Sequence, residues 1–93
     1  MGDQGAPREA SRPSLERFMV RIGERTEVVA ANDVRWMRSD GNYVDLYTVH
    51  GVRTVRETLL ELEQRLDPAR FVRIHRRVIV ALDAIKTLLP WVG

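Results

Sequence analysis

The sequence predicts a mostly β fold, with elongated antiparallel β-sheets and one short α-helix. Apolar and polar residues alternate with a period of two over several short segments, which is typical of half-buried strands. Glycine-containing turn signals separate these segments. Helical apolar spacing is clear only between residues 58 and 67. With 93 residues, the chain is long enough for one domain.

The first fourteen residues are predicted to lie outside this domain. They contain glycine, proline and serine and almost no bulky apolar side chain, as a disordered tail or a linker does. We therefore expect residues 1–14 to be a tail and residues 15–93 to form the domain.

A hairpin is predicted to open the domain. Apolar residues occupy alternate positions from Phe18 to Ile22, and Gly23 can turn the chain back over residues 25–29. Residues 30–33 break the pattern, and we expect Asn32 to cap a single helical turn there.

The segment that starts at Val34 is predicted to be the first strand of a meander. If alternation is strict, Trp36 and Arg38 lie on the same face as Val34. Arg35 and Met37 then lie on the opposite face. This assignment decides which side chains are expected in the core.

Two turns complete the predicted meander. Residues 40–42, Asp-Gly-Asn, are a strong signal for a tight turn, and residues 43–49 are rich in β-branched and aromatic side chains. His50 and Gly51 make the second turn. Residues 52–56 then form the third strand.

The helix is predicted to begin after Thr58. Thr58 and Glu61 have the spacing of a capping box, in which each side chain binds the other residue's backbone N–H. An apolar stripe at helical spacing follows, formed by Leu59, Leu62 and Leu66. Because the other faces are acidic, we expect this helix to support the sheet rather than to face a polyanion.

Positive charge is concentrated in the last quarter of the chain. The formal net charge is only +2, yet residues 70–93 hold five basic residues against one acid. These basic residues are Arg70, Arg73, Arg76, Arg77 and Lys86. Arginine presents a planar fork that matches phosphates and guanine edges. Charge alone fits both a surface that faces a polyanion and a solvated basic face.

Composition argues against several other classes of protein. The absence of cysteine excludes disulfides and thiolate zinc sites, and two histidines are too few for a metal site without several carboxylates. The longest uncharged apolar run, Val78–Leu82, is far too short to span a bilayer, and the N-terminus does not resemble a signal peptide. We therefore expect a cytoplasmic protein that is not an enzyme and has no metal, cofactor or small-molecule substrate.

The most informative segment is residues 73–78, Arg-Ile-His-Arg-Arg-Val. In an extended strand the adjacent residues 75–77 would alternate between faces, and one arginine would point into the core at a high cost. An outward loop avoids this cost and suits insertion into a DNA groove, where the side chains can donate to base edges and phosphates. Alternatively, His75 caps a carbonyl at the core edge and the arginines pair with Glu61 or Glu63.

A resemblance to LytTR-type DNA-binding domains is carried by residues 71–85, FVRIHRRVIVALDAI. The family hallmark reads approximately F-x-R-[IC]-H-[RN]-S-x-I-V-N-x-x-x-I. Residues 34–71, VRWMRSDGNYVDLYTVHGVRTVRETLLELEQRLDPARF, resemble the rest of the pattern in the right order. The resemblance spans about residues 18–90. It implies a LytTR-like, mostly antiparallel β fold and sequence-specific binding of double-stranded DNA by a bacterial transcription regulator, such as a two-component response regulator.

The resemblance also implies a set of contact residues. Loops rather than a helix enter successive major grooves at promoter direct repeats, and two of these loops correspond to residues 39–43 and 75–77. By position, Asn42 and Arg76 are expected to contact bases. The rest of the expected footprint consists of Ser39, Tyr43, His75 and Arg77, which would bind phosphates, and of Arg73 and Lys86, which would add positive charge.

Some positions leave alternatives or depart from the family pattern. Asn42 could serve only to adopt a left-handed turn conformation, and Tyr43 could be an aromatic that packs on the sheet. Arg38 and Arg77 replace an acid and a serine, which adds positive charge. Ala81 replaces an asparagine, which removes a polar anchor near the second loop.

Two further hypotheses come from other classes of function. The family continues past the position of Gly93 with another hairpin, so we expect the chain to be C-terminally short and its sheet edges to favour self-association. A dimerisation or protein-interaction module with weak or no DNA binding, acting as a homodimer, is therefore the second hypothesis. The third is a small hydrolase that uses His75 with Glu57 or His50, although no nucleophile–base or metal-ligand spacing is visible.

Overall fold

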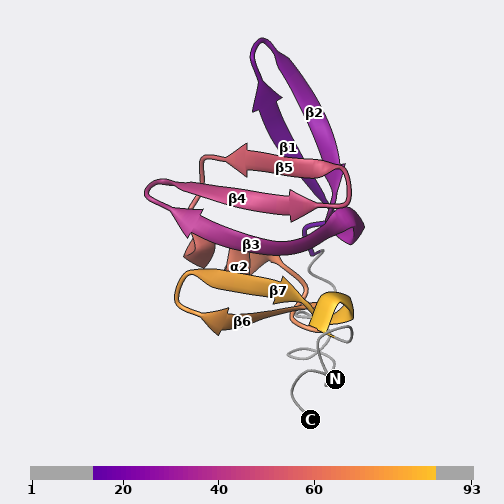
Figure 1. Cartoon of the computed structure of the whole chain (residues 1–93), viewed down its shortest axis with the longest axis vertical. Helices are drawn as coiled ribbons and strands as arrows, with labels where there is room; N and C mark the ends of the chain where they lie inside the picture. The colour runs from indigo at the N-terminus through magenta and orange to yellow at the C-terminus, as the bar shows by residue number, and fades with distance from the viewer. Residues whose placement is uncertain (1–13, 86–93) are drawn as a thin grey trace, which may run out of the picture.

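The computed structural model describes residues 14–85, which form two antiparallel β-sheets and a helix (Figure 1). One sheet has two strands and the other has five, in the order β5-β4-β3-β7-β6. The strands are β1 (Arg17–Ile22), β2 (Arg25–Ala30), β3 (Val34–Asp40), β4 (Tyr43–Thr48), β5 (Gly51–Val55), β6 (Phe71–His75) and β7 (Val78–Ala81). The helix is α2 (Leu59–Arg65), and residues 82–85 are also helical. The predicted antiparallel, mostly β class is confirmed.

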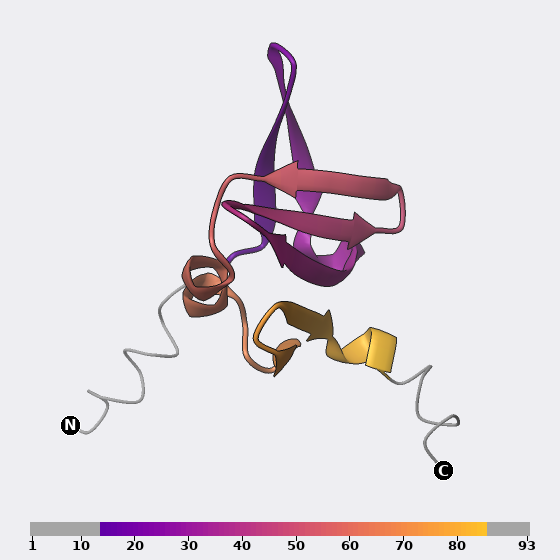
Figure 2. The same cartoon turned by 60° about the vertical axis from the view of Figure 1, so that its left-hand side comes forward.

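The first hairpin projects from the five-stranded sheet (Figures 1 and 2). Phe18 and Val29 pair across β1 and β2, and both side chains are buried. An ion pair between Arg53 Nε in β5 and Glu27 Oε1 in β2, at 2.6 Å, joins the hairpin to the larger sheet. The hydrogen bond from Arg53 holds the pKa of Glu27 below its ordinary value.

A β-bulge changes the faces of β3. The pairing of β3 with β4 shifts between Val34 and Trp36, so one extra residue is inserted on β3. Val34 and Met37 are consequently both buried, whereas Trp36 is partly exposed and Arg38 is exposed. The expectation that Val34 shares a face with Trp36 and Arg38 is therefore wrong. Strict alternation could not reveal the inserted residue.

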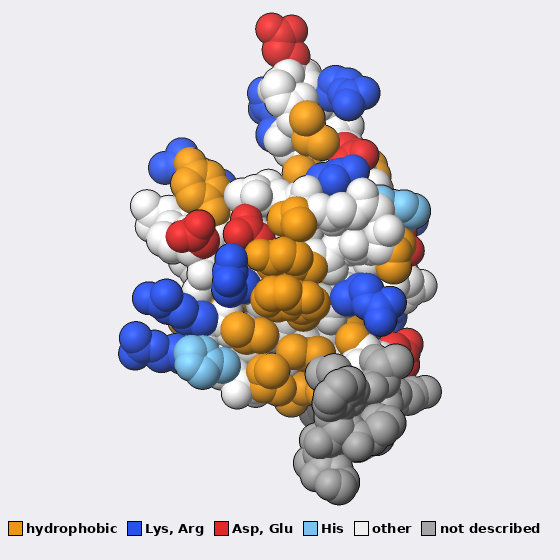
Figure 3. Space-filling view, in the orientation of Figure 1, with side chains coloured by type: hydrophobic (Ala, Val, Ile, Leu, Met, Phe, Trp, Pro, Cys, Tyr) orange, Lys and Arg blue, Asp and Glu red, His pale blue; other side chains and the backbone are white. Residues whose placement is uncertain are grey.

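The face of the five-stranded sheet that points away from α2 carries an apolar row (Figure 3). The row follows the cross-strand pairing through Val52, Tyr47, Trp36, Val80 and Val72. At its centre the rings of Trp36 and Tyr47 stack with their centroids 3.9 Å apart and an interplanar angle of 3°. This row leaves apolar side chains in contact with solvent on the open face.

Helix α2 covers the opposite face of the sheet. The capping box is formed as predicted, since Glu61 N–H donates to Thr58 Oγ1 at 3.0 Å and Thr58 N–H donates to Glu61 Oε1 at 2.9 Å. The predicted stripe of Leu59, Leu62 and Leu66 is buried in the core. The capping therefore fixes where the helix starts, and the leucines fix which side faces the sheet.

The short helical turn before β3 differs from its prediction. The 3₁₀ turn Ala31–Asp33 has Ala30 at its N-cap position, with no side-chain capping hydrogen bond. The predicted capping role of Asn32 is therefore wrong, because this residue lies inside the turn. Leu15 packs against the core, and its N–H donates to the carbonyl of Arg65 at 2.8 Å. The predictions for residues 1–13 lie outside the described residues.

Within residues 14–85, no helix has the length and apolar character needed to cross a lipid bilayer.

Candidate nucleic-acid interface

The two loops that the sequence singled out meet at one end of the five-stranded sheet (Figures 1 and 2). Strands β3 and β7 are antiparallel neighbours, so the end of β3 lies beside the start of β7. Ser39 N–H donates to the carbonyl of Arg77 at 2.9 Å, which joins the two loops directly. We call this region, residues 39–43 and 75–77, the loop end. The structure thus brings together segments more than thirty positions apart in the sequence.

The β3–β4 turn is made by Gly41 and Asn42. Gly41 has φ +63°, whereas no residue other than glycine has a positive φ among residues 14–85. A positive φ at only the first of two turn residues is the signature of a type II′ hairpin turn. The left-handed interpretation of Asn42 is therefore wrong. Because the backbone does not require asparagine here, the exposed Asn42 side chain is available for contacts.

Ser39 and Tyr43 flank this turn in different environments. Tyr43 pairs with Asp40 at the end of the hairpin, and its side chain is exposed rather than packed in the core. Ser39 is half-buried, and its backbone N–H is occupied by the bond to the second loop. Tyr43 therefore offers a ring and a hydroxyl to solvent, whereas Ser39 mainly connects the loops.

The β6–β7 turn exposes two arginines. His75 ends β6, and its Nδ1 accepts a hydrogen bond from Arg77 N–H at 3.1 Å, so the histidine holds the turn closed. The side chains of Arg76 and Arg77 are exposed, and within residues 14–85 neither guanidinium has an acidic partner. Figure 3 shows basic and histidine side chains gathered where this turn lies.

The alternative in which helix acids neutralise these two arginines is wrong. Glu61 caps α2, and Glu63 binds a different residue, Arg73, through Oε1 at 2.8 Å. The ring of His75 accepts an N–H through Nδ1, and among residues 14–85 it makes no hydrogen bond to a carbonyl, so the carbonyl cap of this alternative is not formed. The outward loop predicted from the cost of burying an arginine is the conformation observed.

Arg73 and Lys86 differ from the other predicted contact residues. Arg73 lies partly buried beneath the β6–β7 turn, with its side chain 29% exposed. Its guanidinium binds Glu63 and the backbone carbonyls of His75 and Arg76. The sequence suggested Glu63 only as a partner for the arginines of the loop, and its pairing with Arg73 was not predicted, because their ten-residue separation carries no local signal. Lys86 lies outside the described residues.

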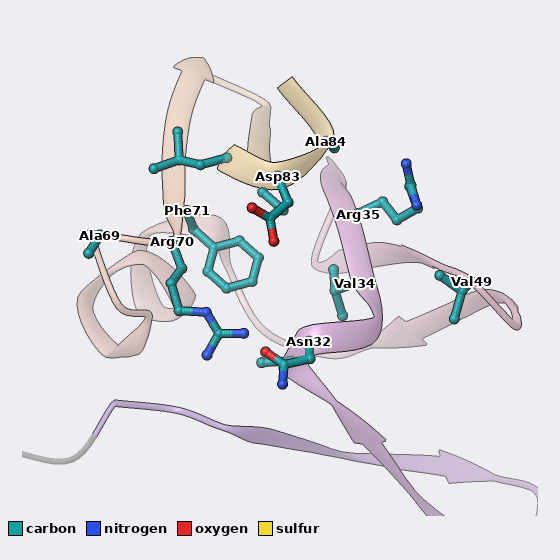
Figure 4. A pocket seen from close by; sticks show the side chains of 12 residues that line it. Asn32, Val34, Arg35, Val49, Ala69, Arg70, Phe71, Asp83 and Ala84 are labelled. Atoms are coloured by element: carbon teal, nitrogen blue, oxygen red, sulfur yellow. The ribbon is translucent and has the colours of Figure 1, made fainter. Parts of the chain in front are cut away.

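A pocket of about 220 Å³ opens at the opposite end of the sheet (Figure 4). Val34 and Phe71 form part of its apolar wall, and Arg70 and Asp83 supply charged groups at its rim. It shares no residue with the loop end. Within residues 14–85, no three histidine or acidic side chains are grouped as a metal site.

The residues of the hydrolase hypothesis are not brought together. His50 lies at the end of the sheet away from the loop end, with Nε2 3.4 Å from Asp33 Oδ2. Glu57 is paired with Arg65 Nη1 at 2.6 Å, and His75 lies in the β6–β7 turn. The structure therefore gives none of the three the pairing that proton transfer between them would require.

Comparisons with known proteins give a family match and several related regulators. Residues 24–93 match the family model described as the LytTr DNA-binding domain. The chain is 39% identical over 72 residues to the CO-responsive transcriptional regulator RcoM of Rhodospirillum rubrum, covering 77% of this chain and 30% of that protein. It is 27% identical over 81 residues to the sensory transduction protein LytT of Bacillus subtilis, covering 87% of this chain and 34% of LytT. The chain thus spans about a third of the length of these relatives.

A solved structure supports the fold. It is the LytTr DNA-binding domain of a protein described as a methyl-accepting/DNA response regulator from Bacillus cereus. The two structures superpose with a TM-score of 0.68 over 75% of this chain and 64% of the other, at 18% sequence identity.

Proposed function

Because the chain belongs to the LytTR DNA-binding domain family and is a DNA-binding domain of a transcription regulator, we propose that it reads its target through the loop end. The observation that carries this proposal is the hydrogen bond from Ser39 N–H to the Arg77 carbonyl, which joins two exposed turns into one surface. Two exposed arginines without acidic partners within residues 14–85 lie on that surface. A binding role, rather than catalysis, fits this arrangement, and we place the domain in the cytoplasm with the chromosome.

The two turns are close enough to read a single stretch of duplex. In the order β4-β3-β7-β6, the centres of the two hairpins are two strand spacings apart, or roughly 10 Å. Successive major grooves are about 34 Å apart along B-DNA. Both turns therefore contact base pairs within one helical turn, and a second groove or a second direct repeat must be reached by another part of the regulator or another copy.

Asn42 and Arg76 are the proposed base readers. Asparagine pairs with the adenine edge through two hydrogen bonds, and arginine pairs with guanine O6 and N7 in the same way. Arg77 and Tyr43 are proposed to bind phosphates on either side of these bases, because both are exposed at the edges of the loop end. His75 and Ser39 are proposed to contribute mainly by holding the turns in place.

A selection experiment tests the proposal. The chain would be titrated with a randomised duplex library at several salt concentrations, because phosphate contacts make affinity depend on salt. We expect Arg76→Ala to relax the sequence preference and Arg77→Ala to weaken all duplexes similarly. Arg21→Ala removes the same charge from the projecting β1–β2 hairpin and should change neither. Failure of the wild-type chain to select any sequence would refute the proposal.

A second candidate function is homodimerisation through the open face. The apolar row from Val52 to Val72 favours it, since exposed apolar patches often mark protein interfaces. Light scattering after size exclusion, with and without DNA, measures the oligomeric state. We expect Val52→Glu, a change at an exposed position, to convert a dimer to a monomer. A monomeric wild-type chain at all concentrations would exclude this candidate.

A further inference from the structure

We propose that Arg73 and Glu63 form a clamp that sets the conformation of the β6–β7 turn, so that Arg73 acts as a positioning residue rather than a phosphate ligand. This inference rests on the proposed function, because it explains how the turn that presents Arg76 is held in a shape that DNA can recognise. It also gives the acidic helix α2 a part in DNA recognition.

All three nitrogens of the Arg73 guanidinium are engaged inside the protein. Nη1 donates to Glu63 Oε1 at 2.8 Å, and Nη2 donates to the carbonyl of Arg76 at 2.6 Å. Nε donates to the carbonyl of His75 at a longer 3.4 Å. A guanidinium has five N–H donors, and this one uses three of them inside the protein, so only one donor on each terminal nitrogen is left.

The clamp acts where the strand ladder is interrupted. The pairing of β6 with β7 shifts between Arg73 and His75, so the backbone there leaves the regular hydrogen-bonding pattern. Arg73 binds the two carbonyls at this irregularity, while His75 Nδ1 binds the N–H of Arg77. Every residue from 75 to 77 therefore has a backbone group held by a side chain. An ordered turn loses less conformational entropy when it meets a partner.

Helix α2 places Glu63 for this role. The capping box of Thr58 fixes the start of the helix, and the fully buried Leu62 fixes its rotation. The next residue, Glu63, then reaches Arg73 on β6 while its side chain stays 43% exposed. The acid is thus directed toward the underside of the turn.

The clamp and simple electrostatics predict opposite changes in DNA affinity when Glu63 is removed. Glu63 is an acid close to a basic DNA-binding surface, so its removal should strengthen binding to every duplex if charge alone matters. If Glu63 orders the turn through Arg73, Glu63→Ala should instead weaken binding to the preferred sequence. We expect a loss of roughly tenfold for the preferred duplex, as for a lost charge-assisted hydrogen bond, and an unchanged or higher affinity for a random duplex.

Two conservative variants sharpen the test. Glu63→Gln keeps an oxygen that can accept from Arg73 Nη1, so it should retain most of the sequence preference. Arg73→Lys keeps the charge but loses the planar fork that reaches three acceptors at once. We expect Arg73→Lys to lose as much preference as Arg73→Ala, with little change in the slope of log affinity against log salt. A phosphate ligand would behave differently, because lysine would preserve binding and alanine would reduce the slope by about 0.9.

A measurement without DNA completes the design. In the free protein, hydrogen exchange of the Arg77 amide should be faster in Glu63→Ala than in the wild type. The backbone amides of helix α2 around Leu62 should stay protected in both. If the wild type selects a sequence and Arg76→Ala abolishes that selection, the proposed function stands. The clamp is then overturned if Glu63→Ala binds the preferred duplex as well as the wild type, or if Arg73→Lys retains full preference.

Discussion

The glycine at the tip of the β3–β4 hairpin offers a test with a control inside the same molecule. Gly41 has φ +63° and Gly23, at the tip of the β1–β2 hairpin, has φ +64°. A Cβ added at either position would meet no atom within 4 Å, so substitution by alanine is opposed only by backbone strain. The two variants therefore perturb equivalent turns, of which one lies at the loop end and the other on the projecting hairpin.

The size of each effect follows from this geometry. A non-glycine residue with a positive φ costs about 1–2 kcal/mol, so both alanine variants should lose a similar amount of unfolding free energy. Only Gly41→Ala also affects a proposed contact, because relief of the strain changes the turn type and reorients Asn42. Loss of a two-hydrogen-bond base contact costs about 1–3 kcal/mol, which corresponds to roughly 5- to 150-fold in affinity for the preferred duplex.

Two measurements on both variants distinguish the loss of a DNA contact from general destabilisation. Denaturant unfolding gives the stability change, and fluorescence anisotropy with the preferred and a scrambled duplex gives the affinity change under conditions where both proteins are folded. We expect equal destabilisation but weakened specific binding only in Gly41→Ala. Equal losses of binding in both variants would show that general destabilisation, rather than the β3–β4 turn, controls recognition. Undiminished binding by Gly41→Ala would remove this turn from the interface.

Three further predictions concern the remaining elements. Arg77→Ala should reduce the slope of log affinity against log salt by about 0.9, the value for one phosphate contact, while Arg21→Ala leaves the slope unchanged. Thr58→Ala removes the helix cap and should lower the unfolding free energy by about 1 kcal/mol in denaturant titrations. Because Arg53 lowers the pKa of Glu27, their pair contributes stability above the ordinary carboxyl pKa and loses it as the pH falls through the lowered value. Thermal melts of Glu27→Gln across acidic pH should therefore lack this part of the pH dependence, and an unchanged profile would contradict the assignment.

Local patterns predicted the elements of the fold well because each depends on neighbouring residues. The capping box of Thr58 and Glu61 formed as expected, since both partners lie within one helical turn. The turn at residues 40–42 and the outward loop at residues 75–77 were also correctly located. In each case the physical cause, a cap, a glycine or the cost of burying charge, is encoded within a few positions.

Features that depend on tertiary pairing could not be predicted from the sequence. The bulge in β3 places Val34 and Met37 on one face, and its position is set by pairing with β4 rather than by any residue type. The alternative that Asn42 adopts a left-handed conformation failed because Gly41 takes the positive φ, and only the strand register decides which of the two residues does so. The pairing of Glu63 with Arg73 depends on how α2 packs against the sheet.

The roles of individual side chains at the loop end remain predictions that the proposed experiments test. The sequence identified the two loops through a family resemblance, and the structure places these loops side by side. Arg76 and Arg77 were expected to point outward, and they are exposed. Charge and periodicity alone could not separate Arg73 from these two, because its partners belong to another element and to the backbone.

The separation between the loop end and the buried core has a consequence for how such domains diverge. Asn42, Arg76 and Arg77 are all exposed at turns, and none belongs to the set of side chains that packs the interior. Exchanging them alters the chemical groups on this surface without disturbing the strand register or the leucines of α2. If the loop end reads DNA as proposed, two copies can acquire different target sequences after gene duplication by a few substitutions at the turns, while both continue to fold on the same framework.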